Sequence, residues 1–151
     1  MSVLLMILSV VLVVSTLTGS TNNYYNAVTK KFLELTNASL TPTPLKRGEK
    51  GYWQAVLKIK RTIHWGIVHI KLTHNFKNYT NVTFVDVKYN LCDYIIDILN
   101  EDCPLPPGMY PFNASTTLPH TFWPGQYYGE VTAYNDKEEQ MMCEMNDFFI
   151  D

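Results

Sequence analysis

Hydrophobic and polar residues alternate along several short segments of the chain. Between residues 53 and 60, Leu57 and Ile59 fall on one face of an extended chain while Lys58 and Lys60 fall on the other. This period of two is typical of a β-strand with one buried face. The same alternation predicts four further strands, at 66–72, 81–91, 126–134 and 140–150.

Turn-forming residues separate these segments and indicate the fold class. Thr-Pro-Thr-Pro at 41–44, Gly48 with Gly51, and Asn-Asp-Lys-Glu at 135–138 interrupt regular structure. No segment has the period of a long amphipathic helix, although 94–99 has room for one helical turn. Short strands divided by turns predict one all-β domain, either a β-sandwich or a barrel.

The N-terminal segment predicts export from the cytoplasm. Residues 1–14 are almost wholly apolar and are followed by small polar residues, although no Lys or Arg precedes the run. The run is shorter than the roughly 20 residues that cross a membrane, so we expect a signal peptide rather than an uncleaved anchor. Cleavage after Ser20, or alternatively after Ser15, leaves a domain at 21–151. We therefore expect a protein that is secreted or enters the endolysosomal lumen.

Four Asn-x-Ser/Thr sequons fit this location, because they are acceptors of N-linked glycans in secreted chains. Asn78 and Asn81 are so close together that we expect only one of them to carry sugar. The four predicted glycosylation sites are Asn37, Asn78, Asn81 and Asn113.

The composition offers little support for catalysis or nucleic acid binding. The formal net charge of -2 supplies no general attraction for nucleic acid. His64, His69 and His74 are spaced by five, so they alternate between the faces of a strand and build no metal site. The chain has no Cys-x-x-Cys, no Gly-x-Ser-x-Gly and no phosphate-binding loop. We therefore expect a protein that is not an enzyme and that needs no metal or cofactor.

Cys92 and Cys103 predict a disulfide in the middle of the chain. Their separation of eleven residues closes a short loop, and the loop-entropy model gives a stabilisation of about 3 kcal/mol. Three prolines between residues 104 and 107 follow, and we expect them to exclude regular strand pairing on the next stretch. The remaining cysteine, Cys143, is either a buried thiol or a bridge between chains.

Several motifs resemble the ML family of secreted lipid-recognition domains. They are Leu-Cys-Asp at 91–93 with Cys-Pro-Leu-Pro-Pro-Gly at 103–108, Leu-Pro at 118–119, Pro-Gly-Gln-Tyr-Tyr at 124–128 and Glu-Gln-Met-Met-Cys at 139–143. The resemblance covers about residues 39–150. The Niemann–Pick sterol carrier is a member, and the 103–108 run is most similar to the phosphatidylglycerol/phosphatidylinositol transfer proteins. Members usually carry an N-terminal cysteine that pairs with the counterpart of Cys143, and residues 24–40 contain none.

This resemblance implies an immunoglobulin-like β-sandwich of two antiparallel sheets with an apolar cavity between them. A sterol, a phospholipid or a fatty acyl chain would be held there by burial of its methylenes, and transient contact with a membrane surface would load it. From the alternation we expect eleven residues to line the cavity: Ala55, Leu57, Ile59, Val68, Ile70, Leu72, Val85, Val87, Tyr127, Val131 and Met142.

Two further groups are candidates for the entrance of such a cavity. Trp65, Phe122 and Trp123 are aromatic residues suited to a membrane interface, and Lys58, Lys60 and Arg61 suit anionic headgroups. Core packing and a solvated sheet face are the alternative interpretations of these two groups. The alternative function is a secreted, glycosylated interaction module, or a lipid-presenting co-receptor, that binds a protein partner.

Overall fold

The computed structural model describes residues 32–42, 44–76 and 79–151. The predicted signal peptide and Asn78 lie outside the described residues, as does the side chain of Asn81. The described part forms seven strands and one helix: β1 (Leu33–Thr41), β2 (Lys50–Ile59), β3 (Gly66–Phe76), β4 (Tyr79–Asn90), α3 (Leu91–Leu99), β5 (Gly108–Thr117), β6 (Gly125–Asn135) and β7 (Gln140–Ile150).

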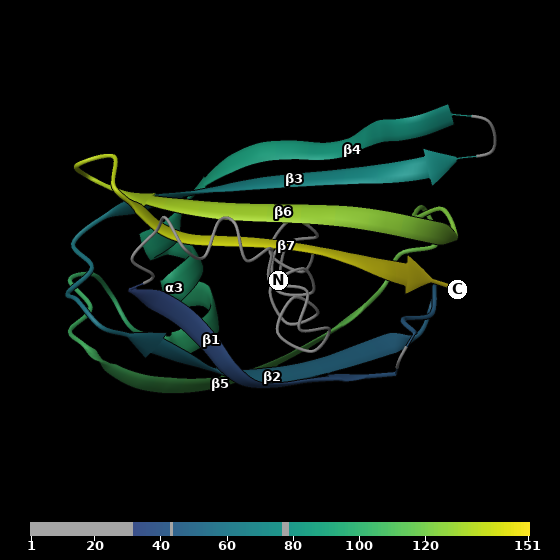
Figure 1. Ribbon diagram of the computed structural model, residues 1–151. Coiled ribbons are helices and arrows are strands. Elements are labelled where there is room, and N and C mark those ends of the chain that lie inside the picture. The colour runs from purple at the N-terminus through teal and green to yellow at the C-terminus, as the bar shows by residue number, and fades with distance from the viewer. Residues whose placement is uncertain (1–31, 43, 77–78) are drawn as a thin grey trace.

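The strands form two antiparallel sheets that face each other (Figure 1). One sheet has three strands in the order β1-β2-β5, and the other has four in the order β4-β3-β6-β7. This arrangement confirms the β-sandwich and excludes the barrel. The five segments with an alternating pattern became β2, β3, β4, β6 and β7, so the period of two correctly located each of them.

The pattern missed two strands, β1 and β5. In β1 the pairing with β2 shifts between Thr36 and Ser39, and Asn37 lies there with a φ of 52°, so the alternation is interrupted. The expectation that prolines exclude pairing after Cys103 is wrong for β5, which pairs with β2 from Gly108 to Thr117 without a register shift. Because β5 is an edge strand, Pro111 can occupy a position that donates no hydrogen bond to a neighbour.

Helix α3 is longer than the single turn expected from the sequence. Asn90 caps its N-terminus, because the Asn90 side chain accepts a hydrogen bond of 2.9 Å from the backbone N–H of Cys92. Asn100 ends it in the left-handed conformation with a backbone N–H that donates to the carbonyl of Ile96. The predicted disulfide between Cys92 and Cys103 is confirmed, and it ties this helix to the segment that leads into β5.

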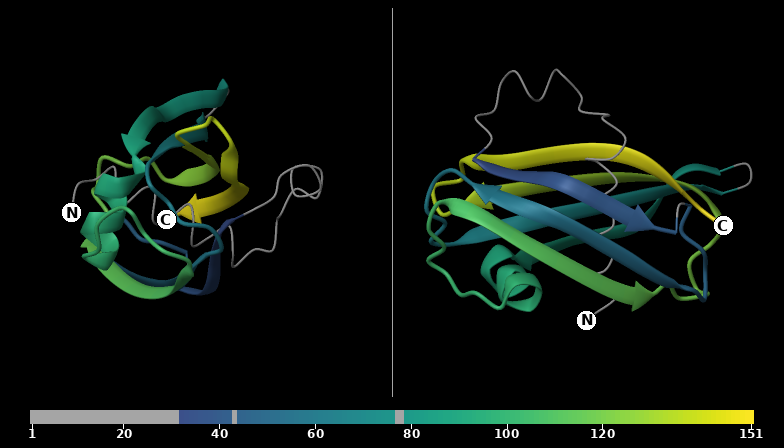
Figure 2. Two further views of the ribbon diagram at one scale, coloured as in Figure 1. Left: turned by 90° about the vertical axis from the view of Figure 1, so that its left-hand side faces the viewer. Right: turned by 90° about the horizontal axis from the view of Figure 1, so that it is seen from below.

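The sandwich has two edges and two ends that position the site. At one edge β1 contacts β7, and at the other α3 contacts β3 and β4 of one sheet and β5 of the other (Figure 2). The α3 end holds the first residues of β3 and β5. The opposite end, here called the 118–124 end, holds the loop of residues 118–124 and the first residues of β2 and β6.

Candidate functional site

The predicted cavity-lining residues lie on the inner faces of the two sheets. Ile70 of β3 pairs with Val87 of β4 on one side and with Val131 of β6 on the other, and paired residues point to the same face. The same register and the alternation of burial along β2 bring together all eleven: Ala55, Leu57, Ile59, Val68, Ile70, Leu72, Val85, Val87, Tyr127, Val131 and Met142.

These residues are buried or half-buried in one apolar cluster that includes residues of both sheets and of α3. Buried apolar side chains fill the interior at the α3 end, where Ile95, Leu105 and Ile63 are no more than 2% exposed. The interior between the sheets therefore offers an environment suited to hydrocarbon. That the eleven residues line a cavity holding a ligand stays a prediction.

Aromatic side chains gather inside the 118–124 end. Tyr127 is stacked on Phe148 with ring centroids 5.6 Å apart, and Phe84 lies 5.6 Å from Tyr127 and 5.1 Å from Phe122. The hydroxyl of Tyr127 donates a hydrogen bond of 2.7 Å to the backbone carbonyl of Trp123. Burial raises the pKa of Tyr127 to about 12. This cluster therefore anchors the 118–124 loop to the inner face of β6.

His74 and Glu144 are buried polar residues that the sequence analysis did not select. His74 is 1% exposed and lies opposite Tyr127, while Glu144 is 7% exposed and lies opposite Val131 on the same inner face. His74 donates from Nε2 to the carbonyl of Pro124, at 3.3 Å. Continuing the alternation of β3 past Leu72 would have placed His74 on this face.

Gly125 permits the close approach of the 118–124 loop to His74. Its φ is +129°, and a Cβ at this position would lie 3.1 Å from His74 Nε2. A larger residue would therefore be strained and would push the histidine away from the loop.

Trp53 carries a third buried polar group that the sequence analysis did not select. It precedes Ala55 by two positions on the inner face of β2, and it is 2% exposed. Among the described residues its indole N–H has no hydrogen-bond acceptor. A buried donor without a partner costs about 1–3 kcal/mol, so this N–H is the strongest sign of a polar contact within the interior. Trp53 lies in the half of β2 nearer the 118–124 end.

The three aromatic residues expected at one entrance do not lie together. Trp65 directly precedes Gly66 at the α3 end, whereas Trp123 lies two residues before Gly125 at the other end. Trp65 and Trp123 are 42% and 43% exposed, and Phe122 is buried. Only Trp123 therefore combines exposure with a position beside the aromatic interior.

The candidate cations for headgroups lie toward the α3 end. Lys60 is 3.4 Å from Glu34, and Arg61 is 3.6 Å from Glu139. Both are exposed pairs of the kind that contribute little to stability. The end that carries Trp123 has different cations, among them the exposed Lys46 in a loop whose Gly48 N–H donates to the Leu118 carbonyl at 2.7 Å.

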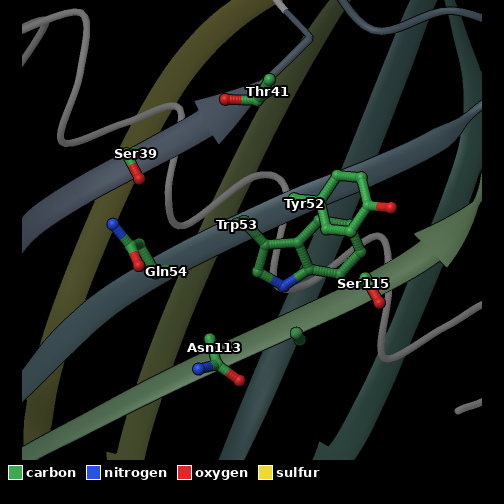
Figure 3. A pocket seen from close by; sticks show the side chains of 8 residues that line it. Ser39, Thr41, Tyr52, Trp53, Gln54, Asn113 and Ser115 are labelled. Atoms are coloured by element: carbon green, nitrogen blue, oxygen red, sulfur yellow. The ribbon is translucent and has the colours of Figure 1, made fainter.

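A groove of about 640 Å³ opens on the other side of the three-stranded sheet, away from the interior (Figure 3). Its described lining comes from all three strands and is mostly polar, with Trp53 and Ala114 as the apolar members. Two rows cross the sheet in register, Ser39–Gln54–Asn113 and Thr41–Tyr52–Ser115. The sequence analysis selected Asn113 alone of these residues, and only as a sequon.

Other functional chemistry finds little support in the described part of the chain. It contains no group of three or more His, Cys, Asp or Glu residues arranged to hold a metal ion. No helix there reaches the length and apolar character that a membrane span requires. Cys143 is buried in β7, opposite Thr132, which favours the buried thiol over a bridge between chains.

Together, a three-stranded and a four-stranded sheet with apolar inner faces and a disulfide-anchored helix define an immunoglobulin-like β-sandwich. The chain belongs to the ML domain family, whose model matches residues 22–148. The motif resemblance noted in the sequence is thereby confirmed.

Individual relatives agree with this assignment. The chain is 28% identical over 106 residues to a phosphatidylglycerol/phosphatidylinositol transfer protein of Schizosaccharomyces pombe, which covers 70% of this chain and 54% of the relative. A protein of the same name from Kluyveromyces lactis is 28% identical over 116 residues, covering 74% of this chain and 63% of the relative. The chain thus spans less than two thirds of the length of these curated relatives.

A solved structure shows the same fold. The Niemann-Pick type C2 protein from the Japanese carpenter ant superposes with a TM-score of 0.53 at 12% identity, covering 82% of this chain and 96% of that one.

Proposed function

We propose that this chain is a lipid-binding and lipid-transfer protein that holds a sterol, a phospholipid or a fatty acyl chain between its two sheets. The observation that carries this proposal is the placement of all eleven predicted apolar residues on the two facing inner surfaces. Membership of the ML domain family and similarity to proteins named for phospholipid transfer support it.

The driving force would be the burial of methylene groups. Each buried CH₂ contributes about 0.8 kcal/mol, so a sixteen-carbon chain would gain on the order of 12 kcal/mol before the costs of association. This mechanism needs no catalytic group, metal or cofactor. Its selectivity would come from a few polar groups at one end of the interior.

The polar groups predict the direction in which a lipid lies. Among the described residues, Trp53 and His74 are buried nitrogen-bearing side chains near the 118–124 end, whereas Ile95 and Leu105 at the α3 end are apolar. We infer that the Trp53 N–H donates to an ester carbonyl or hydroxyl of the lipid, and that the hydrocarbon tail points toward α3. The headgroup would then leave near Trp123.

The same end would make the transient contact with a membrane. Trp123 can insert its exposed ring at the interface while Lys46 meets anionic headgroups. Delivery to such a membrane requires the predicted signal peptide at 1–20 and release into the secretory or endolysosomal lumen.

Native mass spectrometry tests the proposal on full-length protein secreted from eukaryotic cells and deglycosylated. We expect a discrete mass increment that organic extraction removes and that identifies the lipid class. A clean ligand-free mass that persists after incubation with phospholipid vesicles and sterol would contradict it. That second result would favour the interaction module and a search for its protein partner.

A further inference from the structure

The groove on the outer face of the β1-β2-β5 sheet has a lining suited to a neutral, hydroxyl-rich ligand. Its side chains supply three hydroxyl groups from Ser39, Thr41 and Ser115, the amides of Gln54 and Asn113, and the phenol of Tyr52. Among the residues that the structure describes, none that lines the groove is Asp, Glu, Lys or Arg. Hydroxyl and amide groups both donate and accept hydrogen bonds, as a saccharide requires. A phosphate or carboxylate ligand finds no charged partner among these described lining residues.

Tyr52 provides an aromatic surface at the middle of the groove. Its side chain is on the outer face of the central strand and is 54% exposed (Figure 3). Lys50 lies with its Nζ 5.6 Å from the ring centroid. An exposed phenol ring beside hydroxyl and amide groups offers packing for the C–H face of a sugar ring as well as hydrogen bonds for its hydroxyls.

One of the four sequons lies within the groove itself. Asn113 and Ser115, the acceptor and the hydroxyl residue of Asn-Ala-Ser, both line the groove. Ser115 lies directly opposite Tyr52 in the register, and Asn113 lies opposite Gln54, so Asn113 is the diagonal neighbour of Tyr52. Side chains in this diagonal relation are within reach of each other across a sheet.

We propose that the groove seats an N-linked glycan carried by Asn113, with its first sugar residues lying across Tyr52 between β1 and β5. Covalent attachment makes this contact intramolecular, so weak individual interactions suffice to hold the sugar in place. The glycan would cover the outer face of the three-stranded sheet and leave the 118–124 end accessible. The proposal depends on entry into the secretory pathway and is independent of lipid binding.

Asn37 provides a matched comparison on the same sheet. It is exposed at the irregular part of β1 and belongs to the sequon Asn37-Ala38-Ser39, but it does not line the groove. A glycan on Asn37 is therefore not expected to protect Tyr52. The variants Asn113→Gln and Asn37→Asp each remove one acceptor at an exposed position without changing the core, and Asp tolerates the left-handed backbone at residue 37.

The experiment uses the full chain secreted from eukaryotic cells. Peptide mass spectrometry after enzymatic deglycosylation in heavy-oxygen water measures occupancy at each sequon. Hydroxyl-radical footprinting then measures oxidation of Tyr52, with the exposed Tyr128 of the other sheet as an internal reference. We expect Asn113 to be occupied and Tyr52 to be oxidised several-fold more slowly in the wild type and in Asn37→Asp than in Asn113→Gln.

Three results would overturn the proposal. The first is an empty Asn113 in a chain that carries sugar at another sequon, and the second is absence of sugar at every sequon. The third is an occupied Asn113 with equal oxidation of Tyr52 in wild type and Asn113→Gln, which would mean that the glycan projects into solvent. Each leaves the lipid measurement unaffected, so the two proposals fail separately.

A further experiment distinguishes a glycan attached to Asn113 from a saccharide supplied by another molecule. The Asn113→Gln protein is titrated with free chitobiose, and the Tyr52 footprint is read at each concentration. No protection is expected at concentrations where the attached glycan protects fully. Equal protection by the free sugar, with Asn113 empty in the wild type, would assign the groove to an external saccharide and overturn the proposal.

Discussion

His74 of β3 and Tyr127 of β6 lie opposite each other in the antiparallel register, with their ring centroids 4.3 Å apart. Both side chains hold the backbone of the 118–124 loop, because Tyr127 donates to the Trp123 carbonyl and His74 to the Pro124 carbonyl. Two buried residues of the sheet therefore position the loop that presents the exposed ring of Trp123. This relationship connects the interior to the surface where a lipid would enter or leave.

Replacing Tyr127 by Phe tests this connection. The variant keeps the ring but loses the hydrogen bond to Trp123, so we expect the free energy of unfolding to fall by about 1 kcal/mol. Hydrogen exchange of the 118–124 loop should become faster. Chemical denaturation measures the first effect, and Tyr128→Phe on the exposed face is the control. Equal loss in both variants would show that the buried hydrogen bond does not anchor the loop.

The raised pKa of Tyr127 predicts a pH dependence in alkaline solution. Burial raises the pKa of the Tyr127 phenol to about 12 in the folded chain, against 10.0 for a tyrosine in water. The contribution of the protonated phenol to the free energy of unfolding is fully present below pH 10. It is lost as the pH rises toward 12, because between these values only the unfolded state releases the proton. Between these limits the wild type should lose about 2–3 kcal/mol relative to Tyr127→Phe. If the free energy of unfolding fell equally with pH in the two proteins, the raised pKa of Tyr127 would be refuted.

Trp53→Phe tests the proposed orientation of the lipid. The change removes a buried donor that has no acceptor among the described residues, so we expect little loss of stability in the ligand-free protein. Affinity for a phospholipid or fatty acid should fall roughly three- to tenfold, the value of one hydrogen bond. Calorimetric titration provides the measurement, with a plain hydrocarbon ligand as the comparison that should be unaffected. Trp65→Phe at the α3 end is the matched control, and an equal effect there would argue against a specific role for Trp53.

Ala55→Leu tests whether the space between the sheets takes up the ligand. Ala55 is buried on the inner face of β2, and the added carbons would occupy volume that a lipid tail needs. We expect lipid uptake per molecule to fall, at a stability cost of about 1–3 kcal/mol. The control is Val56→Leu on the outer face of the same strand. Unchanged uptake by a well-folded Ala55→Leu protein would place the ligand elsewhere.

Replacing each of the two exposed tryptophans by alanine in turn tests which end of the sandwich contacts the membrane. Trp123→Ala should weaken binding to vesicles that contain anionic phospholipid by roughly tenfold, since a partly buried indole is lost from the interface. Trp65→Ala should leave vesicle binding unchanged, because Trp65 lies at the opposite end of the sandwich. Vesicle sedimentation compares the two, and a larger effect of Trp65→Ala would reverse the proposed orientation.

Much of the architecture could be predicted from local pattern. The alternation of Leu57 and Ile59 with Lys58 and Lys60 specifies a strand and its buried face, because successive side chains of an extended chain point in opposite directions. The spacing of Cys92 and Cys103 likewise specified the disulfide. These features depend only on residues that are near one another in the sequence.

The tertiary structure decided what local pattern does not contain. The pairing of β2 with both β1 and β5 depends on long-range register, and it places Ser39, Gln54 and Asn113 in one row from three separate parts of the chain. It also separated Trp65 from Trp123, which the sequence analysis had grouped because both are aromatic residues suited to a membrane interface. Periodicity shows which face of a strand is buried, but only the packing of the two sheets determines which faces, edges and ends come together in space.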